Sequence, residues 1–256
     1  MARLARYTDE PAFVLHRYDW SESSLVLDVF SREHGRLVLA AKGVKRPTSQ
    51  FRPVLLPLQP LRLSWSGDGE VRTLKAAHWQ GGHVMPTGDA LLAGYYLNEL
   101  LLRLLARDDP HPVLFDHYAQ AVKGLATDAA LQQALLRAFE LVLLQQTGVL
   151  PQLDQEGTSL QALEPQAHYQ LVPDMGLRST PQGEGGLPGA LWLQLQAALG
   201  HPASPWTALL EAVQGGGVAL RQPLRTLLHY HSGVRVFQTR QVLLDVQRLA
   251  QVPATP

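Results

Sequence analysis

The sequence contains no cysteine. Disulfide bonds and metal sites with thiolate ligands are therefore excluded. The opening residues MARLARYTDEPAF lack the apolar run and small-residue cleavage site of a signal peptide. The most apolar stretch, ALLAGYYLNELLLRLLA (90–106), is interrupted by Asn98, Glu99 and Arg103, so we predict a buried helix there and not a membrane span. We expect a cytoplasmic protein.

Catalytic signatures are missing as well. The sequence has no G-x-x-x-x-G-K-[ST] phosphate loop, no G-x-G-x-x-G after a strand, no G-x-S-x-G and no H-E-x-x-H. His229 and His231 are two residues apart on a predicted helix and point in different directions, and the six-residue spacing of His111 and His117 is no better for one ion. We therefore predict no enzyme, no catalytic residue, no metal and no cofactor.

The formal net charge of zero hides an uneven distribution. Residues 1–80 carry 12 Lys and Arg against 8 Asp and Glu, residues 81–211 carry 5 against 13, and residues 212–256 carry 5 against 1. Basic ends thus flank an acidic middle. This asymmetry favours a polyanionic partner.

The basic window, residues 34–67, lies between Glu33 and Asp68 and has no acidic residue. A solvated surface accounts for such a window in its simplest interpretation. However, its potential is not cancelled by acids nearby in the sequence, and it also contains Phe51 and Trp65, on which an unpaired base can stack. We therefore predict a DNA-binding surface that consists of Arg36, Lys42, Lys45, Arg46 and Arg52, with Phe51 as a stacking group.

A second region without acids extends from Glu211 to Asp245. We predict it as a weaker DNA-binding set, formed by Arg221, Arg225, Arg235 and Arg240. No motif presents a helix to the major groove, so binding without sequence specificity is expected. The alternative is an interaction adaptor whose basic β-domain binds an acidic peptide through the same cations.

Short apolar runs dominate the first 80 residues. AFVLHRY (12–18), SLVLDVFS (24–31) and RLVLAAK (36–42) are predicted strands, and two further strands flank GDG (67–69), the clearest hairpin signal. Residues 43–53 contain Gly43, Pro47 and Pro53 and are predicted as a loop. Five short strands indicate a small antiparallel barrel or sandwich.

Helical periodicity begins near Thr87. We predict helices over 87–106, from Asp109–Pro110 onward, and from Asp128 to Gly148. The pattern dissolves over 149–187, where only HYQLV and GLRST suggest a hairpin. Helices resume at GALWLQLQAALG, at Ser204–Pro205, at VALRQPLRTLLHYH and at TRQVLLDVQRLA. The fold class is α+β, with a β-domain over 1–80 and a helical domain over 81–256 that carries the irregular insert 149–187.

Four segments in this order resemble the RecO family of recombination mediators. They are residues 12–46, with Glu22-Ser23-Ser24 and Ala41-Lys42-Gly43, then LQPLRL (58–63), GYYLNELLLRLL (94–105) and LRAFELVLLQQTG (136–148). The resemblance is weak after residue 148, where only TRQVLL (239–244) is suggestive. Many family members carry four zinc-binding cysteines in the region of 149–187, which this chain lacks.

The resemblance implies an OB-fold barrel that binds single- and double-stranded DNA and anneals complementary strands. It implies partners too: RecR, the acidic tail of the single-stranded DNA-binding protein, and indirectly RecA, which would be loaded onto coated single strands. It also implies association with the nucleoid. We expect Tyr95, Leu100 and Leu101 to form a core stripe, with Glu99 as a buried or capping acid, and Glu22-Ser23-Ser24 to shape a turn.

Overall fold

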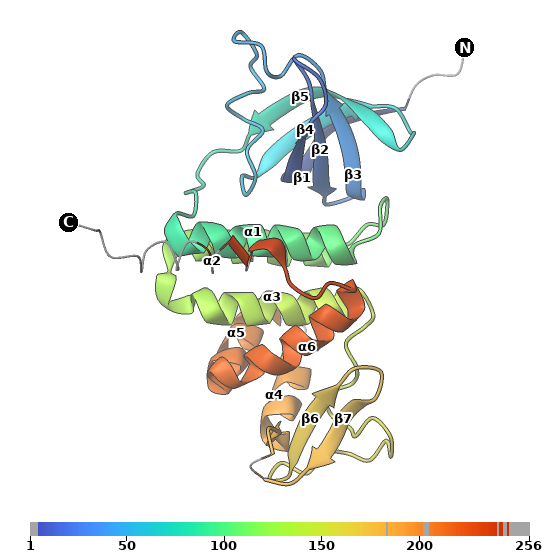
Figure 1. Cartoon of the computed structure of the whole chain (residues 1–256), viewed down its shortest axis with the longest axis vertical. Coiled ribbons are helices and arrows are strands. Elements are labelled where there is room, and N and C mark those ends of the chain that lie inside the picture. The colour runs from blue at the N-terminus through green and yellow to red at the C-terminus, as the bar shows by residue number, and fades with distance from the viewer. Residues whose placement is uncertain (1–4, 183, 202–204, 240, 243–244, 246–256) are drawn as a thin grey trace, which may run out of the picture. The chain divides into compact units, whose positions relative to one another are not determined.

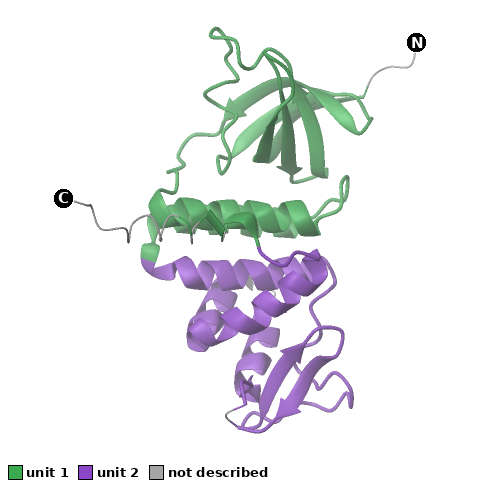
Figure 2. Cartoon of the chain, in the orientation of Figure 1, with its two compact units in different colours: residues 1–129, 237–256 green, residues 130–236 purple. Residues whose placement is uncertain are grey.

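The computed structural model describes residues 5–182, 184–201, 205–239, 241–242 and 245 (Figure 1). The chain divides into two compact units, one of residues 1–129 and 237–256 and one of residues 130–236 (Figure 2). This division differs from the predicted domain boundary at residue 80, because the first two helices fall in the same unit as the strands. The domains 1–80 and 81–256 stay a prediction from sequence.

The first unit contains a closed five-stranded barrel, as predicted. Its strands follow the order β1-β2-β3-β5-β4, in which only β3 and β5 pair in parallel. β1 closes the barrel because its first half, Arg6–Ala12, pairs with β4 and its second half, Ala12–Asp19, pairs with β2. The register shifts between Tyr7 and Glu10 and between Val14 and His16 let it bend. The bounds are β1 (Arg6–Asp19), β2 (Leu25–Ser31), β3 (Gly35–Ala41), β4 (Leu61–Ser66) and β5 (Val71–Trp79).

Short apolar runs form the strands, whose successive side chains point to opposite sides of the sheet. Leu27 and Val29 of β2 point into the barrel core, and Leu37 and Leu39 of β3 join them. The opposite side of β2 carries Asp28 and Phe30, which are buried as well. β2 is therefore covered on both sides, by the barrel core on one and by helices on the other.

The helices up to residue 232 lie close to their predicted positions, with two corrections at their starts, and most of the predicted helix at TRQVLLDVQRLA lies outside the described residues. Asp109 does not begin the second helix, which has His111 as N-cap and Pro112 at its first position. Asp128 is the C-cap of that helix, and the next begins only at Gln132, after a 3-10 turn. The bounds are α1 (Gly88–Leu104), α2 (Pro112–Thr127), η1 (Ala129–Leu131), α3 (Gln132–Gln146), α4 (Gly189–Leu199), α5 (Pro205–Gly216), η2 (Gly217–Leu220) and α6 (Arg221–Ser232).

Aromatic packing joins α2 to the outer side of the barrel. The rings of Phe13 and Phe30 lie with their centroids 5.4 Å from that of Phe115, and Phe13 also meets Tyr118 edge-on at 4.9 Å. The Tyr118 hydroxyl donates to Asn98 on α1, whose amide donates to the carbonyl of Leu15 at 3.0 Å. Burial of this phenol raises the pKa of Tyr118.

Glu99 fastens the end of the chain to α1. Its carboxylate is buried and accepts the backbone N–H groups of Gln238 at 2.8 Å and Thr239 at 2.9 Å, together with the Thr239 hydroxyl at 2.7 Å. Those two residues begin a helical turn, so an anion meets unpaired N–H groups at a helix start. The prediction of a buried or capping acid is confirmed, whereas Tyr95 is too exposed to belong to the core.

The cysteine-free insert does contain the predicted hairpin, formed by β6 (His168–Val172) and β7 (Gly176–Thr180), with β8 (Leu187–Pro188) beside it. Hydrogen bonds hold the preceding loop to it. The Glu156 carboxylate accepts the Ser159 hydroxyl and, at 3.1 Å, the backbone N–H of Ser179. Gly157 allows the backbone to approach β7, because a Cβ there would lie 1.9 Å from the Met175 carbonyl oxygen.

These bonds lower the pKa of Glu156, with the Ser159 hydroxyl as the largest cause and the Ser179 N–H next. A carboxyl whose pKa is depressed in the folded state stabilises the fold above its unfolded pKa, and this contribution is lost as the pH falls through the folded value. We expect wild-type protein to lose more stability than Glu156→Gln between about pH 5 and about pH 3. Urea unfolding at a series of pH values measures the difference, and parallel pH profiles would contradict the assignment.

Candidate nucleic-acid interface

The turn between β1 and β2 is tied to the segment that follows β3. The backbone N–H of Lys45 donates to the carbonyl of Ser23 at 3.0 Å, and the N–H of Gly43 donates to the Ser24 hydroxyl at 3.3 Å. Within the turn, the Ser21 hydroxyl accepts the N–H groups of Ser23 and Ser24. The turn-shaping hydroxyl is therefore that of Ser21, outside the predicted Glu22-Ser23-Ser24 motif, whereas the Ser24 hydroxyl binds the segment after β3. These bonds place residues 20–24 beside residues 43–45.

Three cations of the basic window point to solvent from residues 42–55, the segment that follows β3. Lys42, Arg46 and Arg52 are exposed, and none of them forms an ion pair or side-chain hydrogen bond with any residue the structure describes. Their charge is therefore available to an anion from outside the protein. In Figure 1 the segment extends away from α1 and α2, which lie in the same unit.

Lys45 differs from these three because it already has partners. Its ammonium lies 2.6 Å from the carboxylate of Asp19 and donates to the carbonyl of Ser21 at 2.9 Å. The Asp19 side chain is 83% exposed, so solvent weakens the pair. Lys45 thus supports the turn while its charge stays at the surface.

A cavity of about 490 Å³ opens at this end of the barrel. Its charged lining consists of Arg17, Asp19, Lys45 and Arg52, and its apolar lining of Leu25, Val44 and Leu55. Arg17 pairs with Leu27 across the strands and Asp19 pairs with Leu25, so both side chains lie on the core-facing side of β1. The cavity is the mouth of the barrel. Sequence reasoning missed Arg17 because it lies outside the basic window.

The aromatic residues are arranged differently from the prediction. Trp65 is only 1% exposed and stacks on Tyr7 inside the barrel, so the expectation that a base stacks on it is wrong. Phe51 is half-buried and packs against the same core, which limits its role as a stacking group. Trp20, in the turn beside Lys45, is 72% exposed and was overlooked, although its place next to the Glu22-Ser23-Ser24 motif marked it as a turn residue.

Arg36 is used inside the protein. Its guanidinium binds the buried carboxylate of Asp28, with Nε 2.8 Å from Oδ1, and donates to the carbonyls of Leu102 at 2.8 Å and Leu105 at 3.1 Å. These carbonyls belong to the end of α1, where helical backbone acceptors lack partners. We therefore remove Arg36 from the predicted DNA-binding set, because its donors are occupied and its side chain is 15% exposed.

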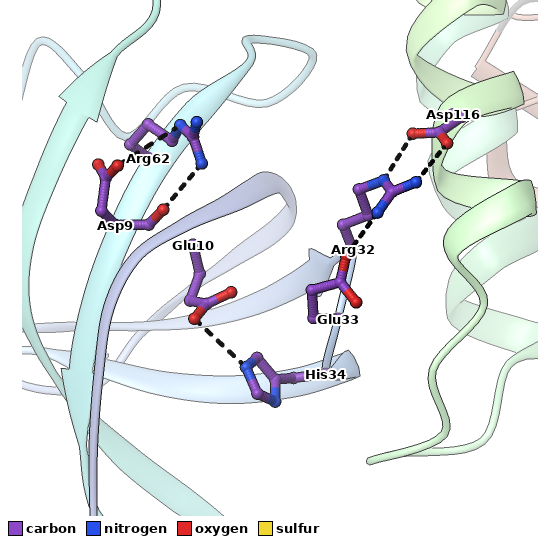
Figure 3. A network of polar contacts seen from close by, with 7 residues as sticks. All are labelled: Asp9, Glu10, Arg32, Glu33, His34, Arg62 and Asp116. Atoms are coloured by element: carbon purple, nitrogen blue, oxygen red, sulfur yellow. Dashed lines mark hydrogen bonds and ion pairs between the residues drawn. The ribbon is translucent and has the colours of Figure 1, made fainter.

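Other cations meet acids that are distant in sequence, as Figure 3 shows. Arg62 of the basic window donates to the carbonyl of Asp9 at 2.9 Å, with the Asp9 carboxylate nearby. Arg32, just before the window, forms a two-pronged contact with Asp116 on α2, and this hydrogen-bonded carboxylate raises the pKa of Arg32. The absence of acids along the sequence thus did not predict their absence in space.

The second predicted set lies mostly in the other compact unit (Figure 2). Arg221 and Arg235 are exposed, whereas Arg225 is half-buried and donates to the ring of His229 at 3.1 Å. Arg240 lies outside the described residues.

Comparison with known proteins matches almost the whole chain to one family. Residues 5–82 match the family model "Recombination protein O N terminal", and residues 85–184 match "Recombination protein O C terminal". The chain belongs to the RecO family. Proteins named DNA repair protein RecO are similar to it: that of Variovorax paradoxus (strain S110) is 58% identical, over 97% of this chain and 100% of the relative. The protein of Polaromonas sp. (strain JS666 / ATCC BAA-500) is 58% identical, over 95% of this chain and 98% of the relative. The protein of Delftia acidovorans (strain DSM 14801 / SPH-1) is 53% identical, over 97% of this chain and 100% of the relative.

Membership of the RecO family fits the features already described. The resemblance drawn from residues 12–148 is confirmed, and so is the OB-fold class of the N-terminal barrel. Among the described residues, every helix is too short or too polar to span a bilayer. The same part of the chain holds no group of three or more His, Asp or Glu side chains arranged for a metal ion.

The two arginines at positions 36 and 46 provide a matched test of internal and external roles. Arg36→Met leaves the buried Asp28 carboxylate without its partner, and we expect the free energy of unfolding to fall by about 3–5 kcal/mol. Arg46→Met removes an exposed cation and should change it by no more than about 0.5 kcal/mol. Urea unfolding measures both values. Equal transition midpoints for the two variants would show that the Asp28–Arg36 pair does not support the fold.

Proposed function

We propose that this RecO-family protein acts in DNA repair by binding the phosphate backbone through the end of its barrel. Two observations support the proposal: Lys42, Arg46 and Arg52 are exposed and form no ion pair with any residue that the structure describes, and the turn bonded to the same segment carries the exposed indole of Trp20. OB-folds bind oligonucleotides through the face of strands 2 and 3 and the adjoining loops. Here Phe30, on the outer side of β2, is buried against Phe115 of α2, so the turn 20–24 and the segment 42–55 remain for DNA.

The chemistry of this surface favours binding without sequence readout. Lysine and arginine neutralise phosphates and release counterions, and this contribution is the same for every base sequence. An exposed indole adds a platform on which unpaired bases of any identity stack. Both single and double strands meet the electrostatic requirement, whereas only single strands use the indole.

Annealing follows from the same electrostatics. Two complementary strands repel each other, and a cationic surface that holds their phosphates lowers the cost of bringing them together while the bases stay free to pair. We further propose that the protein helps to load RecA onto single strands covered by the single-stranded DNA-binding protein, together with RecR. Family membership supports this part of the proposal, and no enzymatic step is assigned to it.

A second candidate function is an adaptor that binds an acidic peptide. The exposed side chains of Lys42 and Arg46 favour it, because ammonium and guanidinium groups bind carboxylates as well as phosphates. The acidic tail of the single-stranded DNA-binding protein has the matching chemistry. Titration with such a peptide, in parallel with an oligonucleotide, separates the two functions.

The salt dependence of DNA binding tests the role of the exposed cations. Lys42→Gln/Arg46→Gln should weaken binding of a single-stranded oligonucleotide and make the plot of log K against log salt shallower by about 0.7 for each lost phosphate contact. The matched control is Arg107→Gln/Lys123→Gln, which removes two exposed cations elsewhere. Fluorescence anisotropy at several salt concentrations measures both. The proposal fails if the two double variants behave alike, or if only peptide binding is lost.

Trp20 provides a separate test of base stacking. Trp20→Ala should weaken single-strand binding by about 1–3 kcal/mol, the usual loss for one stacked base, and change duplex binding much less. Trp79→Ala is the control, because Trp79 is an exposed tryptophan at the end of β5. Affinities for single and double strands of equal length show the difference. A uniform loss on both would point to phosphate contact rather than stacking.

A further inference from the structure

The mouth of the barrel is a cavity with both apolar and charged lining residues. Alternation along β1 turns Arg17 and Asp19 toward the barrel axis, on the same side as the core residue Leu27 and the partly buried Leu25 opposite them. The segment after β3 supplies Val44, Lys45 and Arg52 to the same cavity. An apolar floor is therefore surrounded by three cations and one carboxylate, in a volume within the range of about 300–1,000 Å³ typical of small-molecule sites.

We propose that this mouth receives one unpaired nucleotide of a DNA strand. The inference rests on the proposed function and adds to it a subsite that selects unpaired over paired strands. The base lies on the apolar side chains of Leu25, Val44 and Leu55, and its phosphate meets Arg17 and Arg52 at the rim. Arg17 donates one N–H to the carbonyl of Leu55, at 3.3 Å, so most of its five donors remain for a phosphate.

The requirement for an unpaired base follows from geometry and energy. A base enters a recessed cavity only after it leaves the stack and its partner, and for a base in a duplex this costs a few kcal/mol. The free-energy cost is far smaller for a single strand, because its bases have no partner. A duplex held only by Lys42, Arg46 and their neighbours gains nothing from the cavity.

Asp19 argues for a nucleotide over an acidic peptide as the occupant. Lys45 contacts one carboxylate oxygen of Asp19, and the side chain remains 83% exposed. A carboxylate accepts hydrogen bonds from exocyclic amino groups of bases. The side chains of an acidic peptide have no donor to offer and are repelled at the same position. The exposed indole of Trp20, next in sequence to Asp19, is a further group suited to bases.

The experiment compares a single-stranded deoxyoligonucleotide with a strand of equal length and identical phosphates that carries abasic sites instead of bases. Wild-type protein should bind the abasic strand roughly 5- to 100-fold more weakly. Trp20→Ala is measured in parallel, because stacking on the indole also depends on bases. In that variant the abasic strand should still bind more weakly, since the mouth is intact.

Two variants one residue apart then locate the effect. Leu25→Trp fills the mouth without changing charge, and we expect it to reduce the preference for the base-carrying strand while abasic binding stays unchanged. Val26→Trp adds the same side chain on the opposite side of β2 and should keep the wild-type preference. Circular dichroism and urea unfolding establish that both are folded. If Leu25→Trp is not, Leu25→Phe repeats the test with a smaller side chain.

The outcomes separate the inference from the function on which it rests. Equal affinity of wild-type protein for both strands, or an unchanged preference in Leu25→Trp, overturns the nucleotide subsite and leaves phosphate binding intact. Failure of wild-type protein to bind either strand overturns the proposed function itself. If Leu25→Trp binds both strands normally but loses binding of a hexaglutamate peptide, the mouth is a peptide site and the inference is wrong.

Discussion

The buried contact between Asp28 and Arg36 joins the barrel to the helices of the first unit. Asp28 lies outside the barrel core, on the outer side of β2 beside Phe30. Arg36 on β3 neutralises it and directs its remaining donors to the carbonyls at the end of α1. A single guanidinium thereby satisfies a buried carboxylate and a helix end, two groups that are costly to bury unpaired.

Neighbouring contacts depend on the same junction. Gly35 precedes Arg36 and adopts a positive φ of 66°, and a Cβ there would lie 2.0 Å from the carbonyl oxygen of Asp109. The N–H of Asp108 donates to the carbonyl of Arg36 at 2.8 Å, while the Asp108 carboxylate meets Arg72 on β5. The turn after α1 is therefore fitted to the barrel by backbone as well as by charge. This explains why Asp109 does not act as a helix cap.

The junction also determines which part of the barrel remains open. Helices cover the outer side of β2, where the aromatic rings of Phe30 and Phe115 meet. The turn 20–24 and the segment 42–55 are joined by hydrogen bonds that involve Lys45, Gly43 and three serines, and they surround the mouth. The cationic side chains of the barrel thus form two groups. Arginines near the helices stabilise the fold, and the cations around the mouth face solvent.

Much of this protein was determined by local patterns in the sequence. Short apolar runs and the GDG hairpin predicted the five strands, helical periodicity predicted the helices, and the hairpin at 168–180 followed from two β-rich runs around PDM. These features depend on residues that are neighbours along the chain, and they could therefore be predicted from the sequence. Glu99 was recognised as a buried or capping acid for the same reason, since it interrupts an apolar helix face.

Tertiary structure alone decided which charged and aromatic residues are available. Arg36 and Lys42 look alike in sequence, yet the first is occupied by Asp28 and α1 while the second faces water. Trp65 and Trp20 divide in the same way between core and surface, and Arg17 joins the mouth only because β1 and the segment after β3 meet in space. Ion pairing and burial are set by residues distant along the chain. A charge count over a sequence window contains no information about them.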